Sequence, residues 1–247
     1  MRTLMHKFHR RLILIAALGL GVGAEAGMVP YTDRAAFLGV LSGPAAIINF
    51  DAETAGLIGG QTLMGQPALP AIGVTFPATV PDPVGSAIIQ PAVVADNNGS
   101  NPTSSPPNSL GTDDAGNYHT FIAGSAFELL FTDNLAAFGL DLISPDGLAD
   151  GDFRLEAGLA AVSLVVGDRS LLGNFGGADY YSYFLGLRDD TGAGFGSVAL
   201  RYAANTDGAF LFNLDDLILA PVPTPATLLL VLGGGLSFFA RRRHPAR

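Results

Sequence analysis

The chain has 247 residues and a formal net charge of −9, with 49% apolar and only 14% charged residues. A chain this apolar is not expected to be disordered, and its 32 glycines follow no collagen period. It contains no cysteine, which excludes disulfides, thiolate metal sites and a cysteine nucleophile.

The first 26 residues have the three parts of a secretory signal peptide. A basic stretch ends at Arg11, an apolar stretch covers residues 12–23, and Ala24 and Ala26 form an A-x-A cleavage signal. The alternative is an N-terminal anchor helix, but such a helix needs roughly 20 apolar residues. We therefore expect export and cleavage after Ala26 by signal peptidase.

A second apolar stretch, residues 226–240, lies near the C-terminus and is followed by Arg241, Arg242 and Arg243. As a helix it would be about 22 Å long, against a hydrocarbon core of roughly 30 Å. With bilayer thinning it can span a membrane and leave the arginines on the cytoplasmic side. The alternative is a buried core helix, which the terminal position and the arginines disfavour. We expect a single transmembrane helix.

The box directly before this stretch consists of Val222, Pro223, Thr224, Pro225 and Ala226. Box, short apolar helix and arginine cluster together resemble a PEP-CTERM sorting signal, found in Gram-negative bacteria that make exopolysaccharide. The box departs from the family pattern at one position, where threonine replaces the usual glutamate. The resemblance implies that an exosortase, a membrane-embedded cysteine protease, cuts near the box. The protein would pass from an inner-membrane-anchored intermediate to the cell surface or extracellular matrix.

Between a signal peptide of residues 1–26 and a sorting segment of residues 221–247 lies a domain of residues 27–220. This domain keeps only 5 of the 13 basic residues but 21 of the 22 acidic ones, and no lysine, so its formal net charge is −16. Such a domain is expected to repel nucleic acid and anionic lipid, and to attract cations.

The pattern of residues 27–220 predicts an all-β fold, an antiparallel β-sandwich or barrel. One short helix is expected at residues 32–38, with Thr32 as its cap and with Phe37 and Leu38 on its apolar face. The polar, proline-rich part of residues 81–120 is interpreted as a disordered or mobile loop. In layout the domain resembles the jelly-roll-like β-sandwiches of PEP-CTERM proteins, which are similar to carbohydrate-binding modules. Short apolar runs separated by turn residues are expected to form strands at 47–50, 73–76, 126–131, 137–142, 159–166, 181–185, 197–202 and 210–219.

Carboxylates near the first and last of these runs are the candidate metal ligands. Asp51 and Glu53 follow the first run, and Asp215 and Asp216 lie in the last. If these strands are neighbours, the four acids can meet and hold Ca²⁺, which favours six to eight oxygens; in similar modules a structural calcium sits in such a place. Strand alternation would put Asp215 and Asp216 on opposite faces. The alternative is that the acids are solvated or cap turns.

Tyr181 and Tyr183 share one face of an expected strand and are candidates for a sugar-binding platform, the alternative being core packing. His119 is the only histidine in residues 27–220, so one chain cannot supply a multi-histidine zinc site. No G-x-S-x-G motif accompanies it, and no pair of carboxylates is singled out for glycoside hydrolysis. The acidic stretches 96–100 and 146–152 fit turns better than calcium loops.

These observations favour an exported, non-catalytic surface or matrix protein that binds exopolysaccharide, with Ca²⁺ as its candidate cofactor. Its expected partners are the export machinery, signal peptidase, an exosortase and exopolysaccharide. Two alternatives remain: a carbohydrate-active hydrolase on the same scaffold, and a purely structural matrix or adhesion protein.

Overall fold

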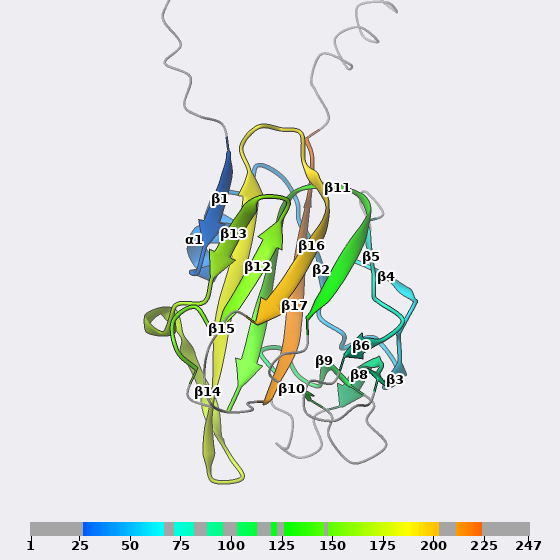
Figure 1. Ribbon diagram of the computed structural model, residues 1–247, viewed down its shortest axis with the longest axis vertical. Coiled ribbons are helices and arrows are strands. Elements are labelled where there is room, and N and C mark those ends of the chain that lie inside the picture. The colour runs from blue at the N-terminus through cyan, green and yellow to red at the C-terminus, as the bar shows by residue number, and fades with distance from the viewer. Residues whose placement is uncertain are drawn as a thin grey trace, which may run out of the picture.

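The computed structural model describes residues 27–66, 72–81, 88–95, 103–112, 120–122, 126–145, 148–202 and 211–223 (Figure 1). The expected signal peptide and the expected anchor helix lie outside these ranges. Within them, no helix combines the length and the apolar character that a bilayer crossing requires.

The described chain is an all-β domain whose strands pair in antiparallel fashion. One short helix, α1 (Arg34–Gly39), and one 3-10 turn, η1 (Val166–Asp168), accompany the strands. The strands are β1 (Met28–Tyr31), β2 (Ala46–Ile48), β3 (Gly56–Leu57), β4 (Thr62–Met64), β5 (Gly73–Thr75), β6 (Val80–Pro81), β7 (Ile88–Ile89), β8 (Pro91–Ala95), β9 (Asn108–Thr112), β10 (Phe121–Ile122), β11 (Phe127–Ser144), β12 (Phe153–Ala157), β13 (Ala160–Ser163), β14 (Ser170–Phe175), β15 (Ala178–Asp189), β16 (Phe195–Tyr202) and β17 (Leu211–Pro221).

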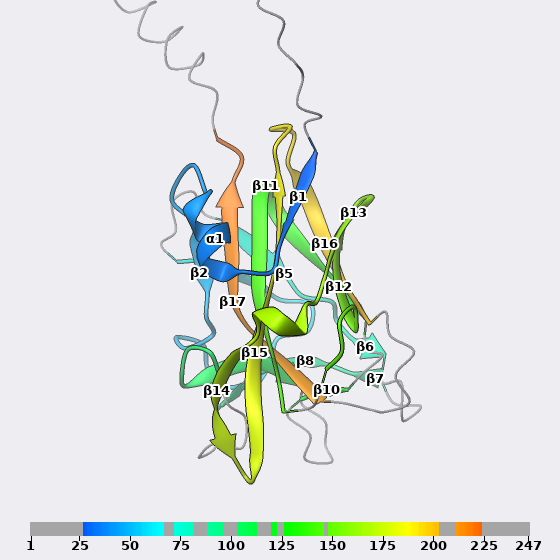
Figure 2. The same ribbon diagram turned by 90° about the vertical axis from the view of Figure 1, so that its left-hand side faces the viewer.

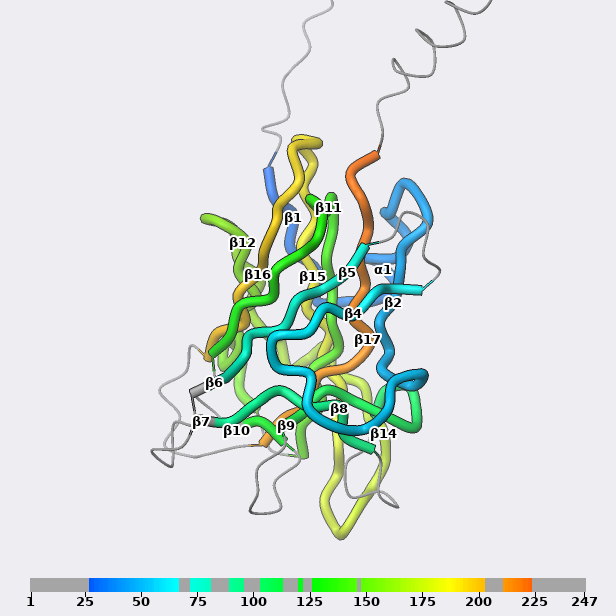
Figure 3. Tube along the Cα trace, turned by 90° about the vertical axis from the view of Figure 1, so that its right-hand side faces the viewer, coloured from blue at the N-terminus to red at the C-terminus, as the bar shows by residue number. Residues whose placement is uncertain are grey.

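The long strand β11 connects two layers. Its first half pairs with β16 and β5, and its second half pairs with β15 and β17. A register shift between Leu130 and Leu135 marks the change of partners. Beyond β16, the first layer continues with β12 and β13. Figures 1 and 2 show the layers face to face, and Figure 3 shows β4 and β5 beside the first half of β11. The arrangement is consistent with a β-sandwich.

Aromatic side chains from both layers meet in the core. The rings of Phe153 and Phe212 lie 4.7 Å apart, and those of Phe121 and Phe212 lie 5.3 Å apart, measured between centroids. All three side chains are completely buried. Burial of a phenylalanine ring contributes about 2–3 kcal/mol, so clusters of this kind hold the layers together without disulfides.

Two facing glycines let α1 dock on the sheet. Gly139 of β11 is opposite Gly186 of β15. A β carbon at Gly139 would lie 2.6 Å from the ring of Phe184 and 3.1 Å from the ring of Phe37. Because neither position has a side chain, Phe37 of α1 is fully buried against Phe184, with 5.2 Å between ring centroids. This contact holds the first turn of α1 over β11 and β15.

Both ends of the described chain lie at one end of the domain, which we call the terminal pole. The backbone N–H of Asp190 donates to the carbonyl oxygen of Gly27 at 3.1 Å, and Asp190 lines the same pocket as Pro223. Figures 1 and 2 show the start of β1 and the end of β17 at one end of the domain and the β14–β15 hairpin at the other. The terminal pole therefore consists of Gly27, the turn after β15 and residues 221–223.

The structure confirms most of the expected strands and corrects several details. The runs at 126–131 and 137–142 form one strand, β11, because the chain stays extended between them and Leu135 pairs with both β16 and β17. The run at 159–166 stops as a strand at Ser163, and η1 follows. Asp33, not Thr32, caps α1 by accepting a hydrogen bond from the backbone N–H of Ala36 at 2.6 Å. Leu38 is 42% exposed instead of packing in the core.

The expectation of a disordered or mobile loop in the polar, proline-rich stretch 96–109 is wrong for its described residues 103–109, where Ser104 and Ser105 bond to Asp215 and β9 begins. Residues 91–95 and 108–112 form β8 and β9, which lie side by side. Ser109, Leu110 and Thr112 are completely buried, and Leu110 is opposite Leu214 of β17. The polar composition conceals this strand, because its burial comes from its neighbours and not from an apolar pattern of its own.

Candidate functional site

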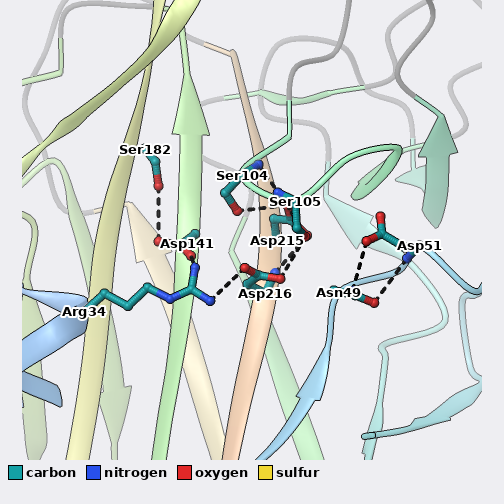
Figure 4. A network of polar contacts seen from close by, with 9 residues as sticks. All are labelled: Arg34, Asn49, Asp51, Ser104, Ser105, Asp141, Ser182, Asp215 and Asp216. Carbon is teal, nitrogen blue, oxygen red and sulfur yellow. Dashed lines mark hydrogen bonds and ion pairs between the residues drawn. The ribbon is translucent and has the colours of Figure 1, made fainter. Parts of the chain in front are cut away.

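A buried polar network centres on Arg34, in the first turn of α1 (Figure 4). The Nη1 atom of Arg34 contacts Asp141 of β11, and its Nη2 atom lies 2.8 Å from Oδ2 of Asp216 in β17. Asp141 also accepts a hydrogen bond of 3.1 Å from the Ser182 hydroxyl of β15. Both carboxylates are more than nine-tenths buried. One arginine thus links the helix to two central strands.

A bulge in β17 directs the side chains of two successive aspartates, Asp215 and Asp216, into this network. Gly139 and Asp141 of β11 are opposite Ile218 and Asp215, so β17 has one residue more than β11 between these pairs. Asp216 lies in this bulge with a φ of 45°, a left-handed conformation that aspartate tolerates better than most residues. The expectation that Asp215 and Asp216 point to opposite faces is therefore wrong, because it assumes regular alternation.

Asp215 receives its donors from the segment before β9. The backbone N–H groups of Ser104 and Ser105 and the hydroxyl of Ser104 donate to the Oδ2 atom of Asp215, each at 2.9 Å, and the Ser105 hydroxyl donates to it at 3.2 Å. The Ser105 hydroxyl also lies 2.9 Å from Oδ1 of Asp216. The side chain of Asp215 is completely buried. Two serines of the proline-rich segment thus satisfy a carboxylate that is closed off from water.

Asp51 lies beside this network, as Figure 4 shows, and Glu53 takes part through its backbone carbonyl oxygen. The Oδ2 atom of Asp51 accepts a bond of 2.9 Å from the amide of Asn49, and its Oδ1 atom accepts a bond of 3.2 Å from the backbone N–H of Asn108. The Asn108 side chain donates to the carbonyl oxygen of Glu53 at 3.0 Å. β2, which leads into Asp51, pairs with β17. The structure therefore brings Asp51 near Asp215 and Asp216, as expected for neighbouring strands.

The network and its surroundings contain four aspartates, which are Asp51, Asp141, Asp215 and Asp216. Each of their carboxylate oxygens accepts a bond from a protein donor. Within the described ranges, no group of three or more histidines, cysteines or acids has the arrangement of a metal site. A calcium ion at Asp51, Glu53, Asp215 and Asp216 would have to share these oxygens with the serine, asparagine and arginine donors. Calcium at this place stays a prediction.

Burial raises the pKa values of several of these acids towards neutral pH. It raises the pKa of Asp141 to about 6, against the opposing effect of the Arg34 charge. Burial, followed by the charge of Asp216, raises the pKa of Asp215 to about 7, although the serine donors favour the carboxylate. Burial also raises the pKa of Asp51. Burial lowers the pKa of Arg34, but the neighbouring carboxylates raise it by more. The pKa is therefore raised overall, and the guanidinium stays charged.

A cleft of about 340 Å³ opens beside the network, between α1 and the strands β14 and β15. The hydroxyls of Ser170 and Ser182 line it together with Arg34, and Phe184 and Leu172 provide apolar surface. This mixture of hydroxyl, charged and apolar groups can bind a small polar ligand or one unit of a polymer.

Charge limits which ligands suit the cleft. Asp33, Asp141 and Asp168 line it and outnumber its one arginine. The hydroxyl of Thr32 donates to Oδ2 of Asp168 at 2.5 Å on the rim. An anionic ligand would meet repulsion here, so the cleft favours neutral or cationic ligands.

The tyrosine platform is not formed as expected. Tyr183 is only 1% exposed and packs in the core, so it cannot offer its ring to a sugar. Tyr181 is half-buried, with Arg169 4.1 Å from its ring centroid. The two tyrosine rings lie 6.5 Å apart on one side of β15, as alternation predicts, but that side faces inward at Tyr183.

The remaining candidate positions are only partly described. Val222 and Pro223 follow β17 at the terminal pole. His119 and the stretch 96–100 lie outside the described residues, as do Ala24, Ala26, Thr224, Pro225, Ala226, Arg241, Arg242 and Arg243. In the stretch 146–152, Asp152 accepts a hydrogen bond of 2.7 Å from the backbone N–H of Ala149, which is the turn chemistry expected there.

Sequence analysis misses Arg34, Asp141, Ser104, Ser105 and Ser182 as parts of the site. One signal was available: Arg34 is one of five basic residues in a domain with 21 acids. An arginine so outnumbered is a natural partner for any buried carboxylate. The two serines carry no comparable signal, because serine is common in turns.

Comparisons with protein-family models, with curated proteins and with solved structures found no match. The inferences about function therefore rest on the sequence and on the site itself.

The raised pKa values of Asp141 and Asp215 predict that stability falls as pH rises from about 4 to about 7. The folded state holds these protons more tightly than the unfolded state, in which both groups titrate near 4. We expect the free energy of unfolding in urea to decrease by on the order of 6 kcal/mol across this interval, about 2 from Asp141 and about 3 to 4 from Asp215. In Asp215→Asn, the part of the decrease nearest pH 7 should vanish.

Asp179→Asn is the matched control, because Asp179 is exposed and distant from the network, and it should keep the pH dependence of the natural chain. Stability that rises between pH 4 and 7 would contradict the assignment. The same unfolding curves in millimolar calcium test the calcium prediction, since an ion that binds only the folded state must stabilise it. An unchanged midpoint would exclude that site.

Proposed function

We propose that this chain is an exported, non-catalytic protein of the jelly-roll β-sandwich kind, sorted through a C-terminal PEP-CTERM-like segment. It would act at the cell surface or in the extracellular matrix of a Gram-negative bacterium. The observation that carries this proposal is the common position of the two chain ends at the terminal pole.

The position of the ends fits two membrane-directed segments. The apolar stretch 12–23 lies just before β1, and the apolar stretch 226–240 follows β17 after a few residues. Because β1 and β17 both reach the same pole, the two segments can enter one membrane from one side. Ends at opposite poles would require a long connection around the domain, which the sequence lacks.

We further propose that the cleft beside Arg34 binds a neutral exopolysaccharide. Arg34 and Ser170 offer donors and acceptors for sugar hydroxyls and Leu172 offers apolar contact, whereas Ser182 and Phe184 are buried at the base of the cleft. The cleft volume of about 340 Å³ is in the range of small-ligand sites. The excess of acids around the cleft disfavours polymers rich in uronic acids or sulfate.

The alternative of a hydrolase has less support from the geometry. Glycoside hydrolysis needs two carboxyl groups on either side of the scissile bond. Of the two acids with pKa values near neutrality, Asp141 borders the cleft, whereas Asp215 is completely buried under Ser104 and Ser105. A binding role therefore agrees better with the arrangement.

The sorting proposal predicts the intact mass of the protein recovered from its native host. Signal peptidase would remove residues 1–26, and an exosortase would remove the chain beyond the Pro223–Pro225 box. We expect a mass that lacks both parts, measured by intact-protein mass spectrometry on the matrix fraction. Retention of Arg241, Arg242 and Arg243 in a membrane fraction would contradict sorting and leave a tethered periplasmic domain.

The polysaccharide proposal predicts that filling the cleft abolishes binding. Ala35 lines the cleft and Ala36 does not, although both are exposed on the same short helix. We expect Ala35→Leu to lose binding to neutral polysaccharide from the host matrix, measured by affinity electrophoresis, because leucine occupies the cleft and offers no hydrogen bonds.

Ala36→Leu is the control and should bind like the natural chain. Equal binding by both variants would place the sugar site elsewhere. If no matrix polysaccharide binds the natural chain, the purely structural matrix role becomes the better account.

A further inference from the structure

The chain stays attached to the folded domain as far as Val222, the first residue of the sorting box. Pro221 is opposite Leu135 in the sheet. Val222 packs on Gly194, where an added β carbon would lie 2.5 Å from Cγ2 of Val222. The domain therefore has no flexible linker of its own before Pro223.

Few residues separate this point from the apolar stretch. Five residue steps lead from Pro223 to Leu228, and fully extended they span at most about 18 Å. A headgroup layer is roughly 5–8 Å thick. Because the stretch 226–240 is short for the hydrocarbon core, insertion draws the residues before it towards the bilayer. The terminal pole is thus held close to any membrane that contains this stretch.

The terminal pole also differs in charge from the rest of the domain. Residues 27–30, 40–44, 188–194 and 220–223 make up most of this surface, and its charged residues are Arg188, Asp189 and Asp190. Asp189 is buried, and the carboxylate of Asp190 lies 2.5 Å from Nη2 of Arg188. The middle of β11, where Asn134 contacts Ala193, adds Asp133. In a domain with a formal net charge of −16, this surface carries little net charge.

Small exposed residues surround a pocket at the pole. A pocket of about 420 Å³ lies between the loop 40–44 and residues 220–223. Val40 is 38% exposed on its rim, and Ser42, Gly43 and Pro44 are exposed beside it. Small, uncharged and partly apolar residues are compatible with the headgroup layer, where a strongly acidic surface would be repelled by anionic lipid.

We propose that the terminal pole lies against the membrane surface while the C-terminal segment is inserted, with the loop 40–44 in the headgroup layer of zwitterionic lipid. This inference rests on the proposed C-terminal anchor. In this orientation the β14–β15 hairpin, at the opposite end of the domain in Figure 1, points away from the membrane. The sorting box then lies between the pole and the bilayer, so the anchored domain limits access to it.

A labelling experiment tests this orientation. The chain has no cysteine, so Ser42→Cys and Asn174→Cys each provide one label site. Both positions are exposed, the first at the terminal pole and the second in β14. Each full chain, purified from a host without exosortase, carries a fluorophore and is reconstituted into phosphatidylcholine vesicles with a spin-labelled headgroup. We expect strong quenching at position 42 and none at position 174.

The outcomes separate this inference from the proposed anchor. If the chain does not float with the vesicles, the anchor itself is wrong. If the chain floats but positions 42 and 174 are quenched alike, the anchor stands and the orientation is overturned. A linker of 20 Gly and Ser residues after Pro223, with an average reach of about 25 Å, should reduce quenching at position 42. Unchanged quenching in that variant would contradict the short tether.

Discussion

The structure depends on the contact of one arginine with a cluster of buried acids. Removing a carboxylate from water costs several kcal/mol unless donors or an opposite charge compensate. Asp141, Asp215 and Asp216 are all nearly or completely buried. In the part of the chain that the structure describes, Arg34 is the one basic residue that forms an ion pair with any of them. The helix, the two strands and the serine segment are therefore coupled through this network.

One part of this network stabilises the fold, and another part borders the cleft. Asp215 is enclosed by Ser104 and Ser105, so it holds the proline-rich segment against β17 and has no contact with solvent. Asp141 and Arg34 border the cleft, and a third of the Arg34 side chain is exposed, whereas Asp141 is buried. A bound sugar would thus contact groups that also determine stability. Binding at the cleft is then expected to depend on the protonation of the network.

The sequence predicts the fold class well, because short apolar runs with period two are local signals. It also places Asp51 near Asp215 and Asp216, since β2 pairs with β17. It fails where the structure departs from regularity: the bulge at Asp216 reverses the expected direction of a side chain, and β9 has no apolar pattern. Arg34 and Ser104 are missed because their roles arise only when distant segments meet. Tyr183 is also assigned wrongly, because strand alternation shows which side chains share a face but not whether that face is buried.

The most direct test of this account is the unfolding free energy of Arg34→Met, which keeps an unbranched apolar stem but shortens the side chain and removes its charge. The account predicts a loss of about 3–5 kcal/mol at pH 8, since buried carboxylates lose their counter-charge, and a smaller loss at pH 5. Arg201→Met removes a more exposed partner of Glu156 and should cost less than about 1 kcal/mol. Equal unfolding free energies for the two variants at pH 8 would contradict the central role of Arg34.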